Sequence, residues 1–121
     1  MLRNGDLIRE RTGGVSMEVT RILVRDPGKA RATTGDVSAG LFTTDWRLMV
    51  EDPAVEIVVE LIGGTTDAFD IVAAALKAGK PVVTGNKALL AERGIELFAL
   101  SREHDTPIHF EAAVAGGIPI I

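Results

Sequence analysis

Short apolar runs that alternate with stretches of helical spacing are the feature that most constrains the fold of this chain. The runs cover residues 18–24, 54–61, 81–83 and 107–110, and several are rich in valine and isoleucine. The run at 54–61 is largely apolar and of strand length, so we expect a strand buried on both faces. Connections of helical length join parallel strands, so the sequence predicts an α/β fold, with a Rossmann-like parallel sheet and flanking helices in one domain over residues 1–121.

The helices are predicted from their apolar spacing and their end signals. One is expected from Thr65 or Thr66 to Gly79, and a second from Asn86, a good N-cap residue, to about Glu103. Shorter helices are predicted at 2–11 and 44–51, a brief extended piece at 41–43, and a polar surface loop at 29–40. The apolar face of the first long helix comprises Phe69, Val72, Ala73 and Leu76, and that of the second Ala91, Ile95, Phe98 and Ala99. Gly94 lies inside the second helix and indicates close packing there.

Composition excludes several classes of function. The net charge is −4, with 13 basic against 17 acidic residues and no basic run, which argues against nucleic acid or an anionic membrane as a partner. No apolar stretch approaches the ~20 residues of a membrane span, and the first residues lack the apolar region of a signal peptide. The absence of cysteine excludes disulfides, thiolate metal sites and thiol catalysis. These features are compatible with a cytoplasmic protein.

Polar residues and glycines gather where the predicted strands end. Ligands of open parallel sheets bind outside the carboxyl ends of the strands, so these exits predict a nucleotide-type site. Each feature alone is also typical of a plain turn, a solvated strand end or a surface ion pair, but the four exits together favour the site. The exits carry Arg25-Asp26, Glu60 with Gly63-Gly64, Thr84 to Lys87, and Glu111 with Gly116-Gly117.

Two cations lie among these exits. Arg25 suits the 2′-phosphate of NADP, whereas the adjacent Asp26 would suit the free 2′-hydroxyl of NAD, so the preference stays open with a lean to NADP. Lys87 should open a helix, where the dipole disfavours a cation. A lone lysine there is more commonly a solvated side chain, and only its neighbours favour a functional role. His104 and His109 lack a partner at catalytic or metal spacing and are read as ordinary residues.

One part of a dinucleotide-binding fold is absent from the sequence. Such folds begin with a strand that runs into G-x-G-x-x-G, and this chain has no such motif. Gly13-Gly14 follows a predicted helix and has the wrong spacing. We therefore expect the chain to lack the first strand and the glycine-rich loop, and to leave no room for a second domain after Ile121.

Specific blocks resemble the homoserine dehydrogenase family over nearly the whole chain. The blocks are Leu23 to Asp26, Ile57 to Gly64, Val82 to Leu90 and Phe110 to Ile120. The resemblance implies an NAD(P)-dependent oxidoreductase that interconverts L-homoserine and L-aspartate 4-semialdehyde, on the route to threonine, isoleucine and methionine. It also implies a homo-oligomeric full-length enzyme.

The resemblance implies site residues as well. Lys87 would be catalytic, beside the nicotinamide and the substrate. Glu111, with the carbonyls of Val114, Gly116 and Ile118, is similar to the family's sodium site, and such oxygen ligands suit a hard cation. The cofactor-binding residues would be Arg25, Ile62, Gly63, Thr84, Asn86 and Lys87.

Three hypotheses remain open. The first is a partial NAD(P)-binding domain of homoserine dehydrogenase without its substrate domain, which would be inactive alone. The second is a stand-alone nucleotide-binding or regulatory module without catalysis. The third is a dehydrogenase that acts on a different semialdehyde, which the blocks at 84–87 and 111–117 disfavour.

Overall fold

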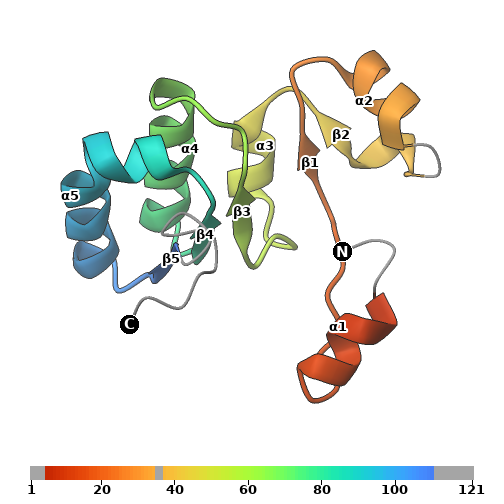
Figure 1. Cartoon of the computed structure of the whole chain (residues 1–121), viewed down its shortest axis with the longest axis horizontal. Helices are drawn as coiled ribbons and strands as arrows, with labels where there is room; N and C mark the ends of the chain where they lie inside the picture. Colours follow the sequence, from red (N-terminus) through yellow and green to blue (C-terminus); the bar gives the residue numbers. More distant parts are fainter. Residues whose placement is uncertain (1–4, 35–36, 111–121) are drawn as a thin grey trace. The chain divides into compact units, whose positions relative to one another are not determined.

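The computed structural model of the chain describes residues 5–34 and 37–110, which divide between two compact units, residues 1–49 and 50–121. Among the described residues, no helix is both long and apolar enough to cross a membrane. Figure 1 shows the elements in order: α1 Gly5–Arg11, β1 Ile22–Leu23, α2 Pro27–Thr34, the 3-10 helix η1 Ala39–Leu41, β2 Phe42–Thr43, α3 Trp46–Glu51, β3 Val58–Glu60, α4 Thr66–Lys77, β4 Val82–Thr84, α5 Lys87–Glu103 and β5 Ile108–His109.

The first unit contains two parallel strands joined through a helix. Ile22 of β1 pairs with Phe42 of β2. The predicted polar loop at 29–40 is wrong for its first part, because α2 occupies Pro27–Thr34. Asp26 explains the difference, since its Oδ1 accepts hydrogen bonds from the amides of Gly28 at 2.9 Å and Lys29 at 3.1 Å. An aspartate N-cap followed by proline is a helix start signal, which the sequence reading took for a turn.

The second unit holds three parallel strands in the order β3-β4-β5. Val58 pairs with Val82, and Val82 pairs in turn with Ile108. The helices α4 and α5 connect successive strands and lie side by side (Figure 1). Right-handed crossovers between neighbouring parallel strands place both helices on the same face of the sheet. The predicted α/β class, with parallel sheets and flanking helices, is confirmed.

The core of this unit lies between the helices and one face of the sheet. Val58 and Val82 point into it and are buried, whereas Val59 and Val83 on the other face are 51% and 37% exposed. The prediction that the run at 54–61 is buried on both faces is therefore wrong. Its even apolar composition does not reveal which face is covered. The fully buried large side chains of the core include Leu76, Leu89, Leu97, Val72, Val82 and Thr84.

Helix α4 follows its predicted pattern. Val72, Ala73 and Leu76 are buried on the expected face. The helix stops at Gly79, whose φ of +72° is readily adopted only by glycine. The amides of Gly79 and Lys80 donate back to the carbonyls of Leu76 and Ala75 and so close the helix end.

Helix α5 has the predicted bounds but a different buried face. Leu89, Gly94 and Leu97 are buried, whereas Ile95, which was expected in the core, is 87% exposed. Two of the four residues on the predicted face were alanines, which are weak markers of burial, and the leucines determine the packing instead. The prediction of that face is wrong.

Arg93 links the two helices. Its Cζ lies 3.6 Å from the centroid of the Phe69 ring on α4, and its guanidinium pairs with Glu96 one turn along α5. The hydrogen bond from Arg93 lowers the pKa of the Glu96 carboxyl, and the same bond raises the pKa of Arg93. Arg93 thus adds a charged side chain at the edge of the largely apolar contact between α4 and α5.

Gly94→Ala is expected to stabilise the chain by about 0.5–1 kcal/mol, because glycine costs that much relative to alanine inside a helix. A Cβ at this position would lie 3.5 Å from Cε2 of Phe98, an ordinary contact distance. The close packing predicted at Gly94 thus leaves room for a methyl group. Urea denaturation of the parent chain and of the variant measures the change, and a loss of stability would show that the contact with Phe98 and Leu90 of the same helix tolerates no added atom.

Lys80 braces the turn that leads into β3. Its Nζ donates hydrogen bonds to the carbonyl of Asp52 at 2.7 Å and to that of Val55. We expect Lys80→Met to lower the free energy of unfolding by about 1–3 kcal/mol, since two carbonyls lose a charged donor. Thermal denaturation measures the change, with Lys77→Met, on the exposed end of α4, as a control that should alter stability little.

Candidate functional site

The carboxyl ends of β3 and β4 lie next to each other in the second unit. Glu60 at the end of β3 pairs in register with Thr84 at the end of β4. This register brings together the loop after β3 and the turn that starts α5. The predicted cofactor residues Ile62, Gly63 and Asn86 follow these two strand ends, which is where ligands of parallel sheets bind.

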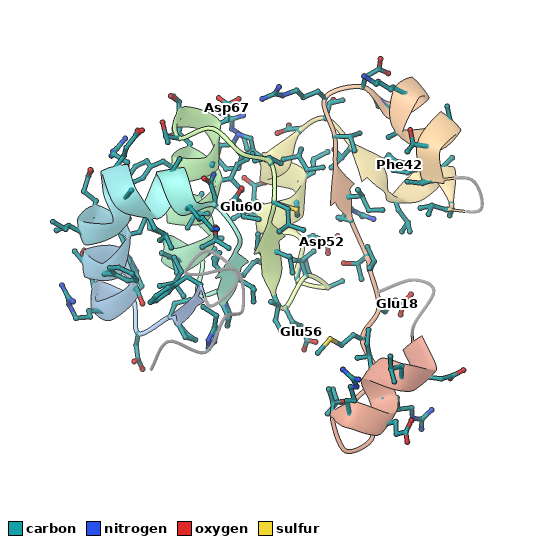
Figure 2. The ribbon with its side chains drawn as sticks, in the orientation of Figure 1. Glu18, Phe42, Asp52, Glu56, Glu60 and Asp67 are labelled. Carbon is teal, nitrogen blue, oxygen red and sulfur yellow. The ribbon has the colours of Figure 1, made fainter. Side chains whose placement is uncertain are left out.

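Glu60 joins the two strand ends through its side chain. Only 3% of the residue is exposed, and Figure 2 shows it on the side of β3 that faces the helices. Its Oε2 accepts a hydrogen bond from the Thr84 hydroxyl at 2.5 Å, and its Oε1 accepts one from the amide of Ile62 at 2.9 Å. The carboxyl group of Glu60 therefore holds the start of the β3 exit loop at Ile62. It also holds the side chain of Thr84 in one rotamer.

Asn86 continues this network into α5. Its amide donates to Oγ1 of Thr84 at 3.1 Å, and its side-chain Nδ2 donates to the carbonyl of Gly64 at 2.6 Å. Its Oδ1 accepts from the amide of Leu89 at 3.1 Å, which confirms the predicted N-cap. Thr84 is fully buried and Asn86 is 7% exposed, so both side chains are occupied in shaping the two loops.

The loop after β3 presents backbone to solvent. Gly63 and Gly64 have φ values of +70° and +75°, and a Cβ built at either one would meet no heavy atom within 4 Å. Glycine is thus favoured at both positions by the positive φ angle, and not by a lack of space for a side chain. Ile62 beside them is 42% exposed. This open turn allows a ligand to approach the main chain closely.

Lys87 is the first residue of α5 and is exposed. Within residues 5–34 and 37–110, no hydrogen bond or ion pair holds its ammonium group. The exposed side chain starts at the carboxyl end of β4, directly after the Asn86 cap. Its backbone position is fixed by the neighbouring Asn86 cap.

Other predicted site residues lie elsewhere. Arg25 is exposed and belongs to the first unit, immediately before the Asp26 cap of α2. His104 ends α5 and His109 lies on β5, both exposed, and no cluster of three metal-ligating side chains occurs within the described residues. The four predicted sodium ligands, Glu111, Val114, Gly116 and Ile118, lie outside the described residues.

Sequence reasoning placed Glu60 at the strand exits but gave it no role. The missing information was the register that sets Glu60 opposite Thr84. A signal was present, since a carboxylate in an apolar run is costly to bury unless a partner satisfies it. The buried threonine of the neighbouring strand supplies part of that compensation.

Comparison with known proteins gives a consistent result. The family model described as "Homoserine dehydrogenase, NAD binding domain" matches residues 4–111. Homoserine dehydrogenase of Pseudomonas aeruginosa is 44% identical over 119 residues, which are 98% of this chain and 26% of that protein. The enzyme of Corynebacterium glutamicum is 44% identical over 121 residues, which are 100% of this chain and 26% of that protein.

Solved structures agree with the sequence relatives. A homoserine dehydrogenase from Thiobacillus denitrificans superimposes with a TM-score of 0.85 and 44% identity, over 98% of this chain and 27% of the other. A hyperthermophilic archaeal homoserine dehydrogenase in complex with NADPH gives a TM-score of 0.71 and 26% identity, over 96% of this chain and 41% of the other. The chain spans about a quarter of the length of the curated relatives it matches. On the match over residues 4–111, this chain belongs to the homoserine dehydrogenase family, in the part that forms its NAD-binding domain.

Proposed function

We propose that this chain forms part of the NAD(P)-binding domain of a homoserine dehydrogenase, with the substrate domain outside residues 1–121. The enzyme would interconvert L-homoserine and L-aspartate 4-semialdehyde, in the biosynthesis of threonine, isoleucine and methionine. The observation that carries the proposal is the family match over residues 4–111, together with the open glycine turn and Lys87 at adjoining strand ends. We also propose a cytoplasmic, homo-oligomeric full-length enzyme.

Ile62, Gly63, Thr84, Asn86 and Lys87 would bind the cofactor in this proposal. The backbone of the exposed Ile62–Gly63 turn would contact it directly, whereas the buried Thr84 and Asn86 would contribute through the shape of the loops. Arg25 would bind the adenosine end. Oδ1 of Asp26 caps α2 through two amides, and we favour NADP over NAD because the neighbouring Arg25 cation suits a 2′-phosphate.

Lys87 would act on the reacting carbonyl. When bound, NAD(P)H supplies the hydride. The Lys87 ammonium would donate a hydrogen bond to the aldehyde oxygen and stabilise the negative charge that develops there as the alcohol forms. Its place beside the Asn86 cap gives the side chain a fixed origin at the strand ends.

We propose a sodium site from the sequence of residues 111–118. One carboxylate, Glu111, and the carbonyls of Val114, Gly116 and Ile118 would form an oxygen-only ligand set, which suits a hard cation. The support is the chemistry of these donors alone. A melting temperature that is higher in sodium than in tetramethylammonium chloride, and no longer so in Glu111→Gln, would be the expected outcome.

Calorimetric titration of the folded chain with NADPH and NADH tests the proposed function. We expect NADPH to bind more tightly than NADH, and Lys87→Ala to weaken both. Binding without homoserine oxidation by the isolated chain is expected, because the chain spans about a quarter of its relatives. Failure of the folded chain to bind either nucleotide would overturn the proposal. Homoserine oxidation by the chain alone would contradict the expectation that catalysis also requires the substrate domain.

A further inference from the structure

Four side-chain hydrogen bonds close a ring around the two strand ends. Glu60 bonds to the amide of Ile62 and to the hydroxyl of Thr84, Thr84 accepts from the amide of Asn86, and Asn86 donates to the carbonyl of Gly64. The chain of hydrogen bonds starts at Ile62 in the β3 exit loop, passes through Thr84 and Asn86 at the start of α5, and returns to the same loop at Gly64. Each of the two loops is thereby held in place by the other.

Backbone groups fix the direction of three bonds in this ring, and Glu60 sets the direction of the fourth, its bond with the Thr84 hydroxyl. The backbone amides of Ile62 and Asn86 can only donate, and the Thr84 hydroxyl donates to Oε2 of Glu60. The lone pairs of Thr84 Oγ1 are then left for the amide of Asn86, at 3.1 Å. The cap bond from Leu89 occupies Oδ1 of Asn86, which directs Nδ2 to Gly64. A side-chain amide at position 60 presents a donor as well as an acceptor, so it would leave either the Ile62 amide or the buried Thr84 hydroxyl without its acceptor.

Burial of this carboxylate is costly. Glu60 is 3% exposed, and within residues 5–34 and 37–110 its carboxyl group meets no lysine or arginine in an ion pair. A buried charge without a counter-ion is retained at a stability cost, which an apolar residue would avoid. The two donors to Glu60 are the Ile62 amide in the β3 exit loop and the Thr84 hydroxyl at the end of β4. Both lie at the candidate site, and we therefore look there for the function that offsets this cost.

We propose that Glu60 is a positioning residue, whose carboxylate holds the Ile62–Gly64 turn and the start of α5 in the arrangement that receives the dinucleotide. The inference rests on the proposed function for its ligand, whereas the ring consists of contacts among this chain's own residues. Loops that are already ordered lose less conformational freedom on binding, and affinity rises accordingly. Glu60 would thus act through Thr84 and Asn86 and need not touch the cofactor.

The test uses Glu60→Gln and Thr84→Val, with Thr84→Ser as the conservative variant that keeps the hydroxyl. Lys80→Met is the matched control, since Lys80 braces the segment that enters β3, at the opposite end of the strand from Glu60. Amide exchange is measured by NMR without nucleotide, and NADPH affinity by calorimetry, both on the whole 121-residue chain. The amide of Thr106, which bonds to the carbonyl of Ser101, serves as the internal reference for global opening.

We expect the amides of Ile62 and Asn86 to exchange at least tenfold faster in Glu60→Gln, relative to Thr106, with NADPH affinity roughly 10- to 100-fold lower. Thr84→Val should release the Asn86 amide in the same way, and Thr84→Ser should restore both protection and affinity. Lys80→Met should lower the melting temperature without changing affinity. This control separates positioning from a general loss of stability.

The outcomes distinguish this inference from the proposed function. Unchanged exchange of Ile62 and Asn86 in Glu60→Gln would overturn the positioning role, whatever the affinity. Faster exchange with unaltered NADPH affinity would overturn the link between the ring and the nucleotide. A third outcome is faster exchange in Glu60→Gln while the folded parent chain binds neither NADPH nor NADH. This outcome would support the ring as the organiser of these loops and overturn the proposed function alone.

Discussion

Leu76→Ala is expected to lower the free energy of unfolding by about 2–5 kcal/mol, the range found when a buried leucine is truncated and leaves a cavity. Leu76 is fully buried on the inner face of α4, where the helix packs against α5 and the strands of the second unit. Little rearrangement can fill the space, because its neighbours are held by the short parallel sheet. Urea denaturation followed by circular dichroism measures the change.

Ile95→Ala is the matched control for that experiment. Ile95 has a similar volume and also lies in a helix, but it is 87% exposed. Its truncation should change stability by no more than about 0.5 kcal/mol. Equal losses in the two variants would show that α5 packs through the face predicted from the sequence rather than through the one described here.

Lys87→Ala is expected to reduce the turnover number of a full-length enzyme that carries this chain by about 10²–10³-fold, the usual effect of removing one donor to a developing oxyanion. Reduction of L-aspartate 4-semialdehyde at saturating NADPH measures it. Lys87→Arg keeps the charge but alters its reach and geometry, so only partial activity should return.

Lys77→Ala provides the control, since Lys77 is exposed at the last turn of α4. Its turnover should equal that of the parent enzyme. If Lys87→Ala changed the Michaelis constant for NADPH but not the turnover number, Lys87 would be a binding residue only, and the role assigned to it at the carbonyl would be refuted.

The long helices were predictable because their ends carry local signals. The Asn86 cap and the Gly79 stop act through hydrogen bonds to their own neighbours, so a few residues suffice to locate them. Helix α2 carried an equally local signal in Asp26 and Pro27, but its small polar residues lack an apolar stripe. Periodicity is an unreliable guide to a helix that buries little.

The strand-exit site was predictable only in outline. The sequence indicates that polar residues follow the strands, and the fold class places those exits at one edge. It does not give the register that sets Glu60 opposite Thr84, because register depends on packing across the whole sheet. The roles of Arg25, Lys87 and residues 111–118 remain predictions.

The outer face of β3 has a consequence for residues 1–121 when they are produced alone in a cell. Ile57, Val59 and Leu61 are 51%, 51% and 75% exposed and form one aliphatic row beside Val83. Chaperones and quality-control proteases recognise exposed apolar strands of this kind. When residues 1–121 are produced alone, this row should therefore make them prone to proteolysis, and replacement of Val59 by threonine should lengthen their half-life.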